Sequence, residues 1–197
     1  MTTTPFATLD QAELLQLALN ATRNNDSGMS IAYLKEAVSR PDATAAAHFI
    51  LGSEYAQIKM YDRAVAEMEA AVALDPTLAI ARFQLGLLWL SSGVPDKALQ
   101  TLQPLEELGE QNELAHFGRG LIHLMRDEFA ETVHCLTRGI ALNTANPALN
   151  ADMQKIIDEV NRFPPETLQN RSASASTEAA GEHHIFISAY TENGRVS

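Results

Sequence analysis

Histidine and cysteine are the side chains of this sequence that are best suited to hold a metal ion or to act as a nucleophile. His116 and His123 lie seven residues apart, His183 and His184 are adjacent, and Cys135 is the single cysteine. One cysteine excludes an intramolecular disulfide, and no spacing of cysteine and histidine matches a structural zinc site. We therefore expect the separated histidines to pack or to face solvent, and the adjacent pair to be solvated.

Acidic pairs and short motifs also fail to indicate an enzyme. Glu106-Glu107 and Asp127-Glu128 are typical of solvated faces and of first helical turns. Cys135 follows His134, and adjacent helical residues point to different sides, so activation of the thiol is not indicated. The sequence contains no G-x-S-x-G, H-E-x-x-H, P-loop or dinucleotide-binding motif. We predict a protein that is not an enzyme and that uses no metal ion or cofactor.

Composition and charge fit an ordinary globular domain. The chain has 197 residues, 46% of them hydrophobic, and a formal net charge of -11. Nucleic acid attracts clustered Lys and Arg, so it is not the expected partner. No stretch resembles a signal-peptide core or approaches the ~18 apolar residues of a membrane span. We therefore expect a cytoplasmic protein without membrane insertion.

A 34-residue repeat organises most of the chain. Gly52, Gly86 and Gly120 are spaced by 34 residues, and placing them at position 8 of a unit aligns other residues by size. Two or more series in the same register are the signature of a repeat architecture. The aligned residues are Phe49, Phe83 and Phe117 at position 5, Tyr55, Trp89 and His123 at position 11, Ala64, Ala98 and Thr132 at position 20, and Met68, Leu102 and Leu136 at position 24.

This pattern of small and large residues resembles the tetratricopeptide repeat, in which each unit is a pair of antiparallel helices. The resemblance spans residues 11–146 and implies an all-α, right-handed solenoid of helical hairpins. The predicted segments are an N-terminal arm (1–10), a divergent repeat (11–44), three full repeats (45–78, 79–112 and 113–146), a capping helix (147–162) and a disordered, flexible tail (163–197).

Several residues depart from the family pattern or extend it. Pro104 falls inside the expected second helix of the repeat 79–112 and should kink or end it. Arg119 and Gly139 replace residues that are usually Leu and Ala, which predicts looser packing in the last repeat. Residues 147–162 form an amphipathic helix that can cover the end of the solenoid. Its predicted inward residues are Met153, Ile156, Ile157 and Val160.

The resemblance also implies a binding surface, because the first helices of successive repeats line a concave groove in this family. Positions 5, 9 and 12 would point into it and make it apolar, with the acidic Glu54 and Glu113 near its rim. The alternative is that the position-5 phenylalanines pack in the core. The candidate groove residues are Leu15, Leu19, Phe49, Ser53, Phe83, Leu87, Leu90, Phe117, Leu121 and Leu124.

We predict a protein–protein interaction module, an adaptor or chaperone-like protein, that binds an apolar peptide segment of a partner. One subset of the family clamps chaperone C-termini with Lys and Asn; here Phe49, Ser53 and Gln84 stand at matching positions, so that clamp is absent. The chain is closer in type to small acidic repeat proteins that shield apolar segments of secretion-system translocators. The alternative is a self-associating scaffold subunit, a homo-oligomer within a larger assembly. The apolar stretch from Ile185 to Tyr190 is a further candidate for docking into a groove.

Overall fold

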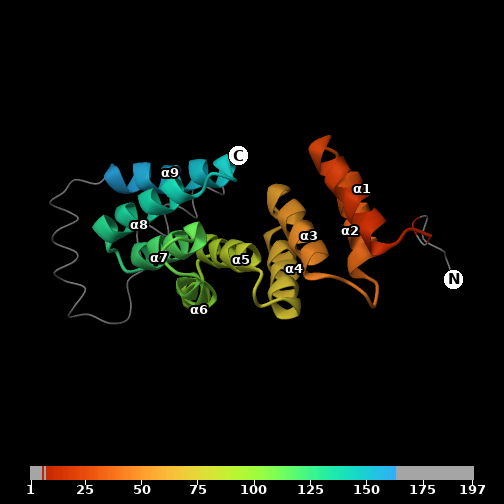
Figure 1. Cartoon of the computed structure of the whole chain (residues 1–197), viewed down its shortest axis with the longest axis horizontal. Coiled ribbons are helices and arrows are strands. Elements are labelled where there is room, and N and C mark those ends of the chain that lie inside the picture. The colour runs from red at the N-terminus through yellow and green to blue at the C-terminus, as the bar shows by residue number, and fades with distance from the viewer. Residues whose placement is uncertain (1–5, 7, 163–197) are drawn as a thin grey trace. The chain divides into compact units, whose positions relative to one another are not determined.

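Helices are the regular elements of the structure. The computed structural model describes residue 6 and residues 8–162, and these residues form nine α-helices and one 3-10 helix, η1, without a strand (Figure 1). The elements are α1 Gln11–Arg23, α2 Ser27–Val38, α3 Ala45–Gln57, α4 Tyr61–Leu74, α5 Ala79–Ser91, α6 Pro95–Leu102, η1 Gln103–Leu108, α7 Glu113–Met125, α8 Phe129–Leu142 and α9 Pro147–Asn161.

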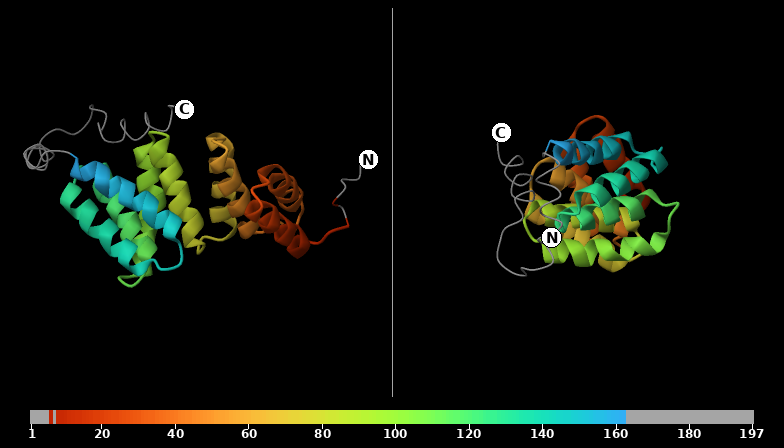
Figure 2. Two further views of the ribbon diagram at one scale, coloured as in Figure 1. Left: turned by 90° about the horizontal axis from the view of Figure 1, so that it is seen from above. Right: turned by 90° about the vertical axis from the view of Figure 1, so that its left-hand side faces the viewer.

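The chain divides into two compact units, and the boundary between Leu88 and Trp89 lies inside α5. In the first unit, α1 pairs with α2 and α3 pairs with α4, while α2 packs against α3. In the second unit, η1 packs against α7, α7 pairs with α8, and α9 packs against α8 (Figure 2). Each unit is therefore built from helical hairpins whose members are neighbours in the sequence.

Four helices, the first helices of three repeats and the capping helix, begin after a polar residue at one position of the 34-residue register, although Leu78 occupies that position before α5. Asp10, Thr44, Asn112 and Asn146 occupy this position, and each accepts a hydrogen bond from a backbone N–H of the first turn. Such side chains satisfy amide groups that a helix leaves unpaired at its start. Asp10 does so in a capping box with Glu13. These caps fix the starts of α1, α3, α7 and α9.

Each first helix ends in a turn whose residue at position 15 has a left-handed backbone. The following N–H donates to a carbonyl oxygen five residues earlier, as from Met60 N to Tyr55 O at 2.8 Å. This is the Schellman pattern, which satisfies the last carbonyl groups of a helix. The same turn therefore closes all four hairpins with different residues. The left-handed residues are Asn25 (φ 57°), Lys59 (φ 61°), Gly93 (φ 73°) and Asp127 (φ 57°).

Pro104 ends the second helix of the repeat 79–112, which confirms the prediction made from its position. Helix α6 stops at Leu102, and residues Gln103–Leu108 continue as the 3-10 helix η1. Leu105 of η1 is buried and lies against Gly118 of α7, where an added Cβ would come within 3.1 Å of the leucine side chain. The change of helix type thus supplies a packing residue for α7.

Helix α9 covers one side of α8 with an apolar stripe, as its amphipathic sequence predicts. Two asparagine side chains form hydrogen bonds where α8 ends and α9 begins. Asn143 Nδ2 donates to Asn150 Oδ1 and Asn150 Nδ2 donates to the Asn143 carbonyl oxygen, both at 2.8 Å. The buried stripe consists of Met153, Ile156, Ile157 and Val160.

Candidate peptide-binding face

Five of the candidate groove residues lie in the first unit and keep part of their surface exposed. Their side chains come from α1, α3 and the part of α5 that precedes Trp89. Positions 5 and 9 are one helical turn apart, so they share one side of each helix. Leu19 is 36% exposed, and the other four are partly buried. We name this set the first-helix face: Leu15, Leu19, Phe49, Ser53 and Leu87.

Polar side chains connect these first helices to one another. Ser53 Oγ on α3 lies 3.1 Å from Gln84 Oε1 on α5 and 2.9 Å from the Phe49 carbonyl oxygen. Thr22 on α1 donates a hydrogen bond to the carboxylate of Glu54 on α3. These bonds place α1 beside α3 and α3 beside α5 within the first unit. The first-helix face therefore combines apolar side chains with groups that can form hydrogen bonds.

Glu54 is buried, which corrects the expectation that it lies at the rim of a groove. Its exposed fraction is 1%, and one carboxylate oxygen accepts a hydrogen bond from Thr22, whose hydroxyl is 3.0 Å from Ser30 Oγ. The other carboxylate oxygen has no hydrogen-bond partner among the described residues. An enclosed carboxylate cannot meet an approaching partner, whereas Glu113 remains partly exposed.

The other five candidates are buried, which corrects the prediction that an open apolar groove runs along all the repeats. Phe83, Phe117 and Leu121 have no exposed surface, and Leu90 and Leu124 are 3% and 4% exposed. A partner cannot touch these side chains without rearrangement of the helices around them. For Phe83 and Phe117 the observed burial agrees with the alternative role, packing in the core.

Gly139 allows the close approach of one of these rings. An added Cβ at Gly139 on α8 would lie 2.4 Å from atoms of the Phe117 ring on α7. The expectation of looser packing at Gly139 is therefore wrong, because the missing side chain makes room for the phenylalanine. Arg119, the other unusual residue of this repeat, forms an ion pair of 2.7 Å with Glu110.

The histidines of α7 and Cys135 take part in contacts within the second unit. His116 Nε2 lies 2.9 Å from the Glu110 carbonyl oxygen, and His123 Nδ1 lies 2.5 Å from Glu128 Oε2. Cys135 is buried, and this burial raises the pKa of its thiol. Within residues 6 and 8–162, no cluster of three His, Cys, Asp or Glu residues is placed to hold a metal ion.

Comparison with known proteins identifies the repeat. A family model described as a tetratricopeptide repeat matches residues 45–78, the span of one repeat of the sequence. No curated protein gives a significant match to the chain.

Several solved structures share the fold. A crystal structure of MamA is 25% identical, with a TM-score of 0.57 over 68% of this chain and 78% of that one. TTC0263, a thermophilic tetratricopeptide-repeat protein of Thermus thermophilus, has a TM-score of 0.62, 14% identity, and coverage of 95% and 100%. YrrB, described as a tetratricopeptide-repeat protein with an unusual peptide-binding site, has a TM-score of 0.57, 16% identity, and coverage of 93% and 92%.

The fold and the matched repeat define a helical solenoid built from repeated helical hairpins. The chain contains a tetratricopeptide repeat at residues 45–78 and has the all-α fold of tetratricopeptide-repeat proteins. No helix in the described part of the chain has the length and apolar character needed to cross a bilayer. The predicted tail and its apolar stretch from Ile185 to Tyr190 lie outside the described residues.

Proposed function

We propose that this chain is a protein–protein interaction module and that it binds an apolar peptide segment of a partner protein on the first-helix face of its first unit. The observation that supports the proposal is the partial exposure of Leu19 and Phe49 on the first helices of consecutive repeats. Burial of these side chains by a partner removes apolar surface from water, which favours binding by about 25 cal/mol per Å². The adaptor and chaperone-like roles predicted from the sequence both use such a surface.

The chemistry of the face also limits the kind of peptide that it can accept. The Ser53 hydroxyl and the Gln84 amide lie together beside the apolar residues, 3.1 Å apart. These groups can pair with main-chain N–H and carbonyl groups of a bound segment, which would otherwise lose their hydrogen bonds on leaving water. The preferred segment therefore carries spaced apolar anchors and leaves its backbone accessible between them.

A selected peptide can take the place of the natural partner in a test of this proposal. Peptides that bind the full chain are selected from a displayed library, and their affinity is measured by calorimetry for the wild type and for Leu19→Ser. We expect Leu19→Ser to weaken binding by about 1–2 kcal/mol, the loss of an interface anchor. The matched control is Leu74→Ser, because Leu74 is 55% exposed on α4, a second helix.

Two results would contradict the proposal. If the wild type and Leu19→Ser bind the peptide with equal affinity, the binding site lies elsewhere. If light scattering detects large assemblies without any peptide, the result favours the self-associating scaffold. Phe83→Ala serves as a core reference, since its ring has no exposed surface. We expect it to lower the free energy of unfolding by about 3–5 kcal/mol.

A further inference from the structure

Phe6 and Leu9, which precede α1, lie against the first hairpin. The Leu9 N–H donates to the Phe6 carbonyl oxygen at 3.0 Å, which closes a single turn. The Phe6 ring is 4.8 Å from the Tyr33 ring, centroid to centroid, with the planes tilted by 52°. Leu9 packs against the cluster that contains Leu14 and Ala37. Two side chains, three positions apart, thus anchor this segment to α1 and α2.

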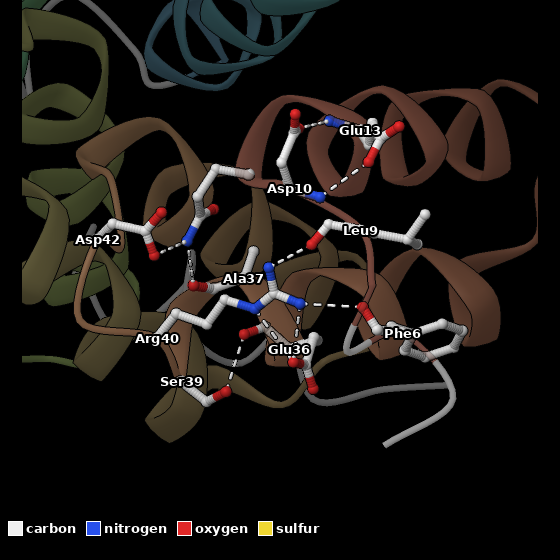
Figure 3. A network of polar contacts seen from close by, with 10 residues as sticks. Phe6, Leu9, Asp10, Glu13, Glu36, Ala37, Ser39, Arg40 and Asp42 are labelled. Atoms are coloured by element: carbon white, nitrogen blue, oxygen red, sulfur yellow. Dashed lines mark hydrogen bonds and ion pairs between the residues drawn. The ribbon is translucent and has the colours of Figure 1, made fainter. Parts of the chain in front are cut away.

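Arg40, just after α2, binds the backbone of the same segment. Its guanidinium donates to the Leu9 carbonyl oxygen and, at 2.9 Å, to the Phe6 carbonyl oxygen (Figure 3). Glu36 holds the guanidinium in place, because its Oε1 lies 3.1 Å from Arg40 Nε and 3.0 Å from an Arg40 terminal nitrogen. The Arg40 and Glu36 side chains are only 19% and 13% exposed, so the pair is largely shielded from water. Shielding strengthens such charge-assisted bonds.

These contacts have the composition of a peptide-recognition site. Every peptide has main-chain carbonyl groups that a guanidinium can bind, so Arg40 recognises a turn of any sequence. Selectivity then comes from the two side chains, an aromatic ring against Tyr33 and an aliphatic residue against the cluster that contains Leu14 and Ala37. Neither set of contacts depends on a covalent connection to the chain.

We propose that Tyr33, Glu36 and Arg40 form a second peptide-binding site, which the chain's own Phe6 and Leu9 occupy as a displaceable latch. The site accepts a partner segment in which an aromatic residue is followed three positions later by a large aliphatic residue. Tyr33, Glu36 and Arg40 do not belong to the first-helix face, and this proposal does not rest on the function proposed for that face. Because the latch is tethered next to its site, its effective concentration is high and a free segment must compete with it. Weakening the latch therefore raises the apparent affinity for a free peptide.

A labelled peptide with the sequence of residues 2–11, TTTPFATLDQ, is the probe for this site. Its binding is followed by fluorescence anisotropy to the full chain and to the Phe6→Ala/Leu9→Ala variant of the full chain. We expect binding to the variant to be at least tenfold tighter than to the wild type. The same peptide with alanine in place of its phenylalanine should bind at least tenfold more weakly. Arg40→Gln, added to the double variant, should also weaken binding at least tenfold.

Equal binding of the peptide to the wild type and to the double variant would overturn the proposal, because the occupied site would then lie elsewhere. If the double variant still unfolds cooperatively but does not bind the peptide, the proposal is overturned as well. If the double variant does not fold, the single variant Phe6→Ala retains Leu9 in its apolar cluster and is tested in the same way. For that variant, the same comparisons of peptide binding with the wild type support or overturn the proposal. Leu19→Ser leaves this site intact, so its effect on library peptides reports separately on the first-helix face.

Discussion

At the scale of single residues, packing in the second unit depends on a matched difference in size. Phe117 fits between α7 and α8 because Gly139 has no side chain at the point where the ring arrives. The sequence aligns both residues correctly by position, but it does not show that one fills the space left by the other. A residue that departs from the family pattern can thus mark close packing rather than weak packing.

Gly139→Ala tests this interpretation of the ring contact. The added Cβ would lie 2.4 Å from the Phe117 ring, so we expect the free energy of unfolding to fall by about 1–3 kcal/mol, the typical effect of overpacking. Urea unfolding measures it, and Phe117→Leu in the Gly139→Ala background should restore part of the loss. Gly28→Ala is the control, because its Cβ would meet only Asp26 Oδ1 at 3.5 Å. In that control, alanine should stabilise the helix by about 0.5–1 kcal/mol. A Gly139→Ala protein as stable as the wild type would refute the size match.

At the scale of elements, the hairpin turns repeat more regularly than the residues that form them. Position 15 is left-handed in all four hairpins, although glycine occupies it only as Gly93. Asn25 and Asp127 tolerate this conformation better than most residues, whereas Lys59 gains nothing from its side chain there. The hairpin α3–α4 therefore contains the most strained of the four turns.

Replacement of Lys59 by glycine should relieve this strain. We expect Lys59→Gly to raise the free energy of unfolding by about 0.5–1 kcal/mol, because the 1–2 kcal/mol cost of a left-handed residue exceeds the extra entropy of glycine in the unfolded chain. The reciprocal control is Gly93→Ala, which should lose about 1 kcal/mol. An added Cβ at Gly93 meets nothing within 4 Å, so that control measures the backbone alone. Chemical denaturation that shows Lys59→Gly to be the less stable protein would rule out the strain.

The element scale also shows how far the sequence alone leads. Helix pairs, the change of helix type after Leu102 and the stripe on α9 follow from periodicity and proline. Asp10, Thr44, Asn112 and Asn146 share a further position of the 34-residue register, and this series would have located the starts of α1, α3, α7 and α9 independently. Exposure of the groove residues could not be predicted, because Phe49 and Phe83 have the same type and repeat position but differ in burial. Burial depends on packing that neither type nor spacing encodes.

At the scale of the whole molecule, one repeat pattern produces two compact units. The 34-residue register continues through residues 79–91, yet the boundary between the units lies within this helix, α5. A different element covers apolar residues at the end of each unit. The N-terminal residues Phe6 and Leu9 lie on the first hairpin, and α9 lies on the last.

Removal of α9 should reveal how much the second unit depends on its terminal helix. Met153, Ile156, Ile157 and Val160 are at most 5% exposed, so a chain that ends at residue 146 would leave the apolar side of α8 in water. Terminal caps keep repeat proteins soluble, and we expect this truncated chain to self-associate with increasing concentration in light scattering. In the full chain, the milder Ile156→Ala should lower the free energy of unfolding by about 2–5 kcal/mol. Gln154→Ala, on the exposed side of the same helix, should change it by no more than about 0.5 kcal/mol. A truncated chain that remains monomeric and keeps the melting temperature of the full protein would show that α8 needs no cover.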